Sequence, residues 1–257
     1  MIALYRGRGL IYYVGAALLI ANALFGAAFS TDVRTIAGIT GLIAVAISVT
    51  LIFVGPKSLP EHAPRAVHPP VRGRWLAVNS PASAVPSHGV RMYGQAYAID
   101  LVFDPEGATR PSYGAMNKPQ DYPAFGQPVF AMIDGEVVTA TGWRRDHRTR
   151  STVIAMVYFL IEGGIREIGG PGFILGNHVT IRGADGVFAT VAHLKQGSIT
   201  VKSGQQVKAG DQLAECGNSG NSTEPHVHAQ LMDRRSPWLG QGIPIEGLPK
   251  NGEHLNA

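Results

Sequence analysis

Two long uncharged segments at the start of the chain constrain its architecture more than any other feature. Residues 10–29 and 36–54 contain no acidic or basic side chain, and each has about the 20 residues that a helix needs to cross a bilayer. A short segment that contains Asp32 and Arg34 separates them. The sequence therefore predicts a transmembrane helical hairpin over residues 1–55.

The first segment has a second interpretation, a signal peptide with Arg6 and Arg8 as its basic start. Its apolar stretch is longer than the usual run of about 7–15 residues, and no clean A-x-A cleavage site follows, which favours the hairpin. Basic residues flank both outer ends of the hairpin. The positive-inside tendency alone would therefore place both ends in the cytoplasm.

Charge is distributed unevenly along the chain. Residues 1–75 carry seven basic and two acidic side chains, a net charge of +5, whereas residues 76–257 carry a net charge of −1. The positive charge beside the apolar segments suits anionic lipid headgroups. The lack of net basic charge after residue 75 argues against nucleic-acid binding. The single cysteine, Cys216, permits no intrachain disulfide.

A proline-rich segment follows the hairpin. Residues 56–74 contain five of the 17 prolines and are predicted to form a semi-rigid linker. A soluble domain then covers residues 75–257. Within it, residues 97–103 alternate as a strand does, with Asp100 on the face opposite the aromatic side chains.

Turn residues and apolar runs predict the other elements of this domain. One hairpin is expected over residues 128–141, around Asp134 and Gly135, and another around residues 184–186. Residues 152–168 are apolar with few helix breakers and are predicted to form an inserted helix. The expected fold class is mostly β, an antiparallel sheet or sandwich with one inserted helix.

Three histidines and one aspartate occur in patterns that suit chemistry. His226 and His228 form an H-x-H, and residues i and i+2 of a strand face the same side. His193 ends another strand pattern. Each pattern alone is more typical of a solvated strand than of a site. An inward-facing Asp100 needs a pairing partner, either an arginine or a metal ion.

The order and spacing of several motifs resemble one known family. The motifs are Ala192-His193-Leu194, the glycine-spaced run over residues 201–210, and the polar loop 217–222 followed by Pro225, His226 and His228. Together they resemble the lysostaphin-like (LytM-type, duplicated-hybrid-motif) zinc metallopeptidases, which are cell-wall endopeptidases. The resemblance covers roughly residues 75–235 and implies an antiparallel sheet with a groove over the metal.

The resemblance also implies roles for individual residues. One Zn²⁺ is expected as cofactor, held by the ligands His88, Asp100 and His228. His193 and His226 are expected to be the catalytic histidines.

One departure from the family pattern concerns the first zinc ligand. The family places this histidine four residues before the aspartate, where this chain has Ala96. We expect His88, twelve residues before Asp100, to replace it by way of a glycine-containing loop, with His178 as the reserve candidate. The other histidines are predicted to be solvated: His62, His68, His147 and His254.

The predicted function is a membrane-anchored zinc metalloendopeptidase that hydrolyses peptide bonds of peptidoglycan. Its partners would be peptidoglycan and the lipid bilayer. It would be a multi-pass membrane protein with an extracytoplasmic catalytic domain, because peptidoglycan lies outside the cytoplasmic membrane. The alternative is a degenerate family member that binds the cell wall or activates a separate hydrolase. A carrier-type barrel is disfavoured, since no lysine lies at a suitable hairpin tip.

The inserted segment over residues 143–176 has two interpretations, a cover over the groove or a surface that packs against the membrane. Four arginines precede its helix and are predicted to form a solvated charge run: Arg144, Arg145, Arg148 and Arg150.

Overall fold

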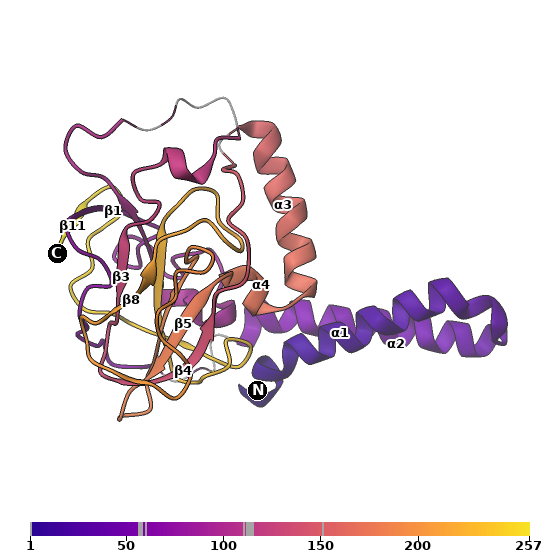
Figure 1. The fold of residues 1–257 in the computed structure, drawn as a ribbon. Coiled ribbons are helices and arrows are strands. Elements are labelled where there is room, and N and C mark those ends of the chain that lie inside the picture. Colours follow the sequence, from indigo (N-terminus) through magenta and orange to yellow (C-terminus); the bar gives the residue numbers. More distant parts are fainter. Residues whose placement is uncertain (1, 56–58, 60, 110, 112–115, 151) are drawn as a thin grey trace. The chain divides into compact units, whose positions relative to one another are not determined.

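The structure is a computed structural model that describes residues 2–55, 59, 61–109, 111, 116–150 and 152–257. It divides into two compact units, Met1–Glu61 and His62–Ala257 (Figure 1).

The first unit is a helical hairpin. It consists of α1 (Ile2–Phe25), a short 3-10 turn (Gly26–Ala28) and α2 (Thr31–Val54). The helices are antiparallel, since Ser48 Oγ near the end of α2 donates to the Arg8 carbonyl oxygen near the start of α1 (2.9 Å). Both are long and apolar enough to cross a membrane by length and composition. The predicted hairpin is confirmed as a pair of helices, while its membrane crossing stays a prediction.

Small residues bring the two helices together. A Cβ atom added to Gly15 would lie 2.9 Å from both the Ala44 Cβ and the Gly41 carbonyl oxygen. A Cβ atom on Gly41 would lie 2.8 Å from Leu19 Cγ. Such close approach through glycine and alanine is typical of helix pairs that associate within lipid, where apolar side chains alone provide no driving force.

The second unit is an antiparallel β-sheet domain with inserted helices. Its strands are β1 (Arg74–Val78), β2 (Ile99–Phe103), β3 (Pro128–Phe130), β4 (Gly135–Thr141), β5 (His178–Arg182), β6 (Phe188–Ala192), β7 (Gln206–Val207), β8 (Gln212–Glu215), β9 (Val227–Met232), β10 (Gly242–Ile243) and β11 (His254–Asn256). Its helices are α3 (Val153–Ile168) and α4 (Pro171–Leu175), with 3-10 turns at Met92–Tyr97 and Pro119–Asp121.

One large sheet dominates the domain. Its strands follow the order β11-β1-β2-β9-β6-β5-β4-β7, with β10 on β9, while β3 and β8 form a separate pair. The domain has a hydrophobic core of its own, drawn entirely from residues after 62, to which Trp75, Leu101, Leu213 and Leu231 contribute fully buried side chains. This core satisfies the alternating strand patterns seen in the sequence.

The chain joins this domain earlier than the sequence indicates. Residues 62–74, assigned above to the linker, lie within the second unit. Val71 is fully buried in its core, and Arg65 forms a parallel bridge with Ile245.

Two expected hairpins have different outcomes. The hairpin around residues 184–186 is confirmed, because β5 and β6 pair with Val179 opposite Val191. The prediction of a hairpin around Asp134 and Gly135 is wrong, because β3 pairs with β8, and β4 pairs with β5 and β7. Turn residues show that the chain changes direction but cannot specify which strand it pairs with next.

The predicted inserted helix is confirmed as α3. Thr152 caps its N-terminus, where the side-chain oxygen accepts a hydrogen bond from the Ala155 backbone N–H (3.0 Å).

Candidate active site

The register of three central strands assembles the site. The pairing of β2 with β9 places Asp100 opposite His228, and the pairing of β9 with β6 places His228 opposite Ala192, which directly precedes His193. Residues from distant parts of the sequence therefore meet on one face of the sheet.

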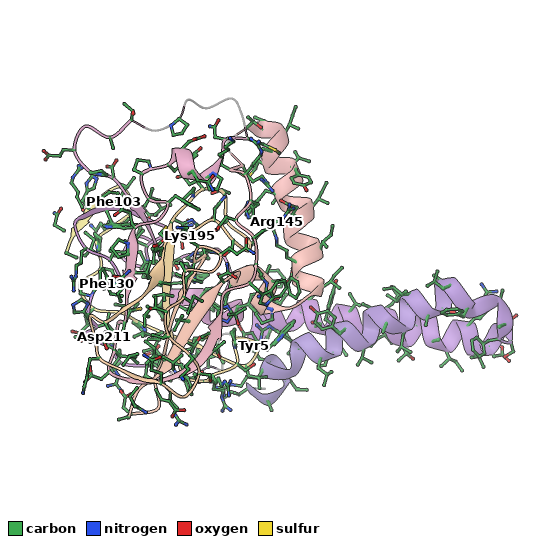
Figure 2. The ribbon with its side chains drawn as sticks, viewed as in Figure 1. Tyr5, Phe103, Phe130, Arg145, Lys195 and Asp211 are labelled. Atoms are coloured by element: carbon green, nitrogen blue, oxygen red, sulfur yellow. The ribbon has the colours of Figure 1, made fainter. Side chains whose placement is uncertain are left out.

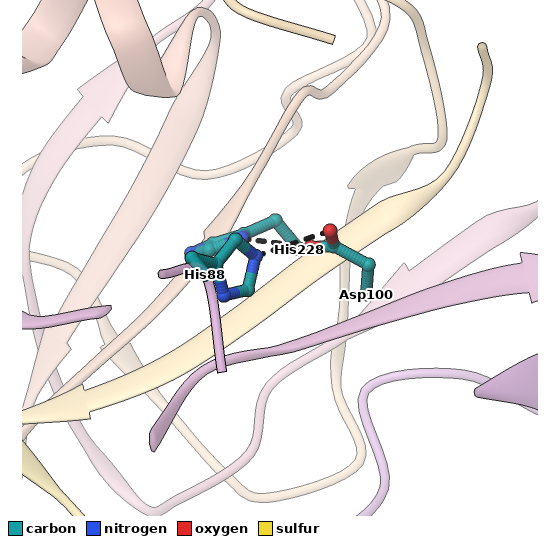
Figure 3. Close-up of side chains that lie close together, drawn as sticks. All are labelled: His88, Asp100 and His228. Atoms are coloured by element: carbon teal, nitrogen blue, oxygen red, sulfur yellow. Dashed lines mark hydrogen bonds and ion pairs between the residues drawn. The ribbon is translucent and has the colours of Figure 1, made fainter. Parts of the chain in front are cut away.

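His88, Asp100 and His228 form a compact group around one carboxylate (Figure 3). His88 Nε2 lies 3.1 Å from Asp100 Oδ2, and His228 Nδ1 lies 2.9 Å from Asp100 Oδ1. The candidate ligand atoms all lie within 4.8 Å of one another. Asp100 and His228 are buried and His88 is partly buried, so the group is largely withdrawn from solvent.

Hydrogen bonds on the far side of His228 determine its tautomer. Its Nε2–H donates to Gln230 Oε1 (2.9 Å), and Gln230 Nε2 donates in turn to the Tyr93 carbonyl oxygen (3.0 Å). The proton of a neutral His228 therefore lies on Nε2, and the Nδ1 lone pair faces Asp100.

The same arrangement holds for His88. The Ser87 hydroxyl donates to the Ala98 carbonyl oxygen (2.7 Å) and can accept from His88 Nδ1–H (3.0 Å). The Nε2 lone pair of His88 is then directed at Asp100. Asn79 Nδ2 donates to Asp100 Oδ2 (2.8 Å) and orients the carboxylate.

This donor set fits a metal cation. Two imidazole lone pairs converge on an ionised carboxylate. When both imidazoles are neutral, no proton lies between His88, His228 and Asp100, so their electron-rich atoms face one another. A cation between them would relieve this repulsion. Two imidazole nitrogens and one carboxylate oxygen are ligands that Zn²⁺ accepts, and three protein ligands leave a further position open.

His193 and His226 lie beside the candidate ligands. Their ring centroids are 4.7 Å apart. His193 Nδ1–H donates to the Ser219 carbonyl oxygen (2.8 Å), and His226 Nδ1–H donates to the Glu224 carbonyl oxygen (2.8 Å). These bonds leave the Nε2 atoms as the nitrogens that can exchange protons, and His226 Nε2 lies 3.5 Å from Asp100 Oδ1, with which it pairs when protonated.

The backbone of His193 is strained. Its φ is 61°, in the left-handed region that side-chain-bearing residues seldom adopt. Hydrogen bonds hold it there, from its N–H to the Leu175 carbonyl oxygen and from the Gly217 N–H to its own carbonyl oxygen. Such strain is characteristic of residues whose orientation serves a site.

Electrostatic coupling perturbs three groups of the site. Burial raises the pKa of Asp100, but the neighbouring His88 and His226 outweigh it and hold that pKa well below its usual range. Burial, together with His226 and His228, lowers the pKa of His193 well below its usual value. Burial lowers the pKa of His226, but the adjacent Asp100 outweighs it and raises that pKa.

A groove of about 630 Å³ opens over these residues. One wall comes from the loop that carries His88, including Val90 and Tyr93, and another from α3 and α4, including Leu160 and Ile174. Polar and apolar surfaces therefore both border the histidines and Asp100.

The structure brings together all five residues that the sequence singled out. Of the other histidines, His178 lies outside the group, with its Nδ1–H donating to the Gly176 carbonyl oxygen (2.9 Å). His147 was expected to be solvated, and this is wrong. It is buried, and its ring nitrogens face the Arg148 and Gly220 carbonyl oxygens (3.0 and 2.9 Å), so it supports the loop behind His193. The periodicity of the sequence could not predict that His147 packs against a loop distant in the chain.

The arginine run is also more structured than expected. Arg150 is buried and pairs with Glu162 of α3 (2.7 Å), whereas Arg145 and Arg148 are exposed.

Sequence reasoning missed the residues that orient the candidate ligands. Gln230 could have been found, because it follows His228 by two residues and shares its strand face. Asn79 and Ser87 carry no local signal, since only tertiary structure places them beside Asp100 and His88.

Comparison with known proteins finds one matching family. The model of peptidase family M23 matches residues 116–239. The match includes His193, His226 and His228, and it begins after His88 and Asp100. By this match, the domain that contains these residues is similar to peptidase family M23.

Individual relatives are distant. The cell division protein DipM of Caulobacter vibrioides is 33% identical over 115 residues, which cover 42% of this chain and 19% of that protein. The chain thus spans about a fifth of this curated relative.

Two solved structures are also similar. The lysostaphin catalytic domain of Staphylococcus simulans is 20% identical, with 70% of this chain and 88% of that chain covered and a TM-score of 0.34. A zinc-containing peptidase of Vibrio cholerae is 21% identical, with 74% and 40% covered and a TM-score of 0.32.

Proposed function

We propose that this protein is a membrane-anchored zinc endopeptidase that hydrolyses peptide bonds of peptidoglycan. The observation that carries the proposal is the convergence of two imidazole lone pairs and one carboxylate beside two further histidines whose Nδ1–H groups are bound to carbonyl oxygens. The family match supports peptide hydrolysis, and the resemblance to cell-wall endopeptidases supports the substrate class.

His88, Asp100 and His228 would hold the metal. A Zn²⁺ ion bound there would act as a Lewis acid toward the scissile carbonyl and toward water. Gln230 and Ser87 keep the ligand nitrogens of His228 and His88 unprotonated through the hydrogen bonds on their opposite ring nitrogens.

His193 and His226 would handle protons and developing charge. Because each Nδ1–H is bound to a carbonyl oxygen, each Nε2 can accept a proton from the attacking water or return one to the leaving amine. When protonated, Nε2–H can also stabilise the tetrahedral oxyanion. The groove would receive the peptide in an extended form between its two walls.

The test measures zinc content and product release together, by mass spectrometry, on the full chain in detergent with purified peptidoglycan. We expect one zinc per chain and new peptide fragments whose release a chelator abolishes. His228→Ala and His88→Ala should lose zinc. His193→Ala should retain zinc and lose turnover by about 10²–10⁴-fold.

His62→Ala, at a histidine away from the group, is the matched control and should retain both zinc and turnover. Zinc without fragments would contradict the enzymatic proposal and favour the alternative, a non-catalytic wall-binding or hydrolase-activating module. Normal zinc in His88→Ala would remove His88 from the ligand set.

A further inference from the structure

Helix α3 directs two charged side chains, Glu162 and Arg166, toward the domain. Glu162 faces inward, where it accepts hydrogen bonds from Arg150 (2.7 Å) and from Arg166 (3.3 Å). The Arg150 side chain is only 5% exposed, and Ala155 is fully buried. Charged residues therefore attach this helix to the domain.

The opposite side of α3 is apolar and open to solvent. Its seven residues, exposed to between 55% and 84%, are called here the outer face: Val153, Ile154, Val157, Leu160, Ile161, Ile165 and Ile168. They recur at three- and four-residue spacings, which places them along one side of the helix, and Figure 2 shows side chains projecting from α3 away from the domain. None of the seven carries a charge.

This pattern inverts the usual amphipathic helix, whose apolar side packs on the core. Scattered exposed apolar residues need no explanation, but a contiguous patch of this kind marks a surface for a membrane or a partner. The outer face therefore requires an occupant.

The residues beside the outer face identify a lipid surface as that occupant. Trp143 is 65% exposed, and the Arg144 guanidinium stacks on its ring and on that of Phe173 (4.5 and 4.4 Å). A Cβ atom on Gly169, just after α3, would lie 2.7 Å from the Phe173 ring. Aromatic rings with arginine at the edge of an apolar surface match the interface of a bilayer, where anionic headgroups attract the cation.

Chain length also favours a lipid surface. Only residues 55–61 lie between the end of α2 and the start of the second unit, and a chain of this length reaches at most about 25 Å. This step rests on the proposed membrane anchoring by α2, whereas the chemistry of the outer face does not.

We propose that the outer face of α3, with Trp143 and Phe173, lies in the headgroup and acyl-chain boundary of the bilayer. The helix lies on the membrane and does not span it. Its 16 residues measure about 24 Å, less than the roughly 30 Å hydrocarbon core, and Glu162 holds its inner side to the domain.

The test places an environment-sensitive fluorophore on the outer face of the full chain. An Ile154→Cys variant is labelled, reconstituted into phosphatidylcholine–phosphatidylglycerol vesicles and read with quenchers attached to the lipid acyl chains. The native Cys216 is fully buried and stays unlabelled in the folded protein. Ala184→Cys, in the exposed turn between β5 and β6, is the matched control.

We expect blue-shifted emission and quenching by lipid at position 154, with water-like, unquenched emission at position 184. Adding Ile161→Ser and Ile165→Ser should shift the emission at 154 toward that at 184. Water-like emission at both positions would overturn the proposal. So would blue-shifted emission without lipid quenching, accompanied by crosslinks between position-154 cysteines in an unlabelled sample, because the occupant would then be a second copy.

The double serine variant should still release fragments from soluble peptidoglycan peptides, because neither residue lines the groove. If the chain without the two serine substitutions releases no fragments while the label at position 154 is still quenched by lipid, only the proposed function is contradicted.

Discussion

At the residue scale, the orientation of each imidazole depends on a neighbour that takes no part in the chemistry. Gln230 accepts from His228 Nε2–H, Ser87 can accept from His88 Nδ1–H, and Ser219 offers its carbonyl oxygen to His193. Each contact determines which ring nitrogen faces the groove. A ligand set that looks complete in sequence therefore depends on hydrogen bonds behind it.

Gln230 offers a direct test of this dependence. Gln230→Met preserves side-chain volume but removes the acceptor for His228 Nε2–H, so the ring can bind its proton on the wrong nitrogen. We expect zinc affinity to fall by about 10–100-fold, measured by competition with a chromophoric chelator. Gln206→Met, at an exposed position on β7, is the control. Equal affinity in the two variants would show that Gln230 does not position the ligand.

At the element scale, two glycines let the loops behind the site cross. Gly220 has φ 76°, and a Cβ atom there would lie 2.4 Å from the Gly176 backbone nitrogen. The neighbouring Ser219 carbonyl oxygen holds His193. Backbone packing in these loops and the orientation of His193 are therefore linked.

A comparison of Gly220→Ala with Gly186→Ala should separate the cost of backbone strain from the cost of disturbed loop packing. Gly186→Ala, whose φ is 80° with open space around the Cβ, should lose about 1 kcal/mol for its left-handed backbone alone. Gly220→Ala should lose a further ~1–3 kcal/mol through the clash and should also lower peptide turnover. Thermal unfolding in detergent and fragment release measure the two effects. Similar losses in both variants would mean that the loops relax freely.

At the scale of the whole molecule, α3 connects the groove to the surface proposed to meet lipid. Leu160 belongs to the outer face and also lines the groove. A lipid contact on α3 would thus steady one wall of the proposed substrate site, while the helical hairpin would anchor the chain. The two proposed membrane contacts act on different elements and can be separated by mutation.

Topology provides the prediction at this scale. Two spanning helices place the N-terminus and the second unit on the same side, and hydrolysis of peptidoglycan requires that side to be extracytoplasmic. An alkaline phosphatase fused at the C-terminus should therefore be active, although the basic residues at the hairpin ends favour the opposite orientation. Deletion of residues 31–54 should abolish that activity if α1 then spans alone with its N-terminus still outside. A C-terminal reporter that works only in the cytoplasm would exclude access to the cell wall.

Sequence alone was sufficient where local period carries the information. The uncharged runs indicated α1 and α2, and the apolar stretch after Thr152 indicated α3. The H-x-H spacing predicted that His226 and His228 face the same side, because side chains of a strand alternate with a period of two, although β9 begins at Val227, one residue after His226.

Tertiary structure decided what depends on contacts between distant segments. It places His88 next to Asp100 and Gln230 behind His228, and it buries His147. It also paired β3 with β8 instead of β4. The period of an amphipathic helix shows that α3 has an apolar side, but not which way that side points. Its outward orientation follows from the pairing of Glu162 with Arg150 inside the domain, which no local pattern encodes.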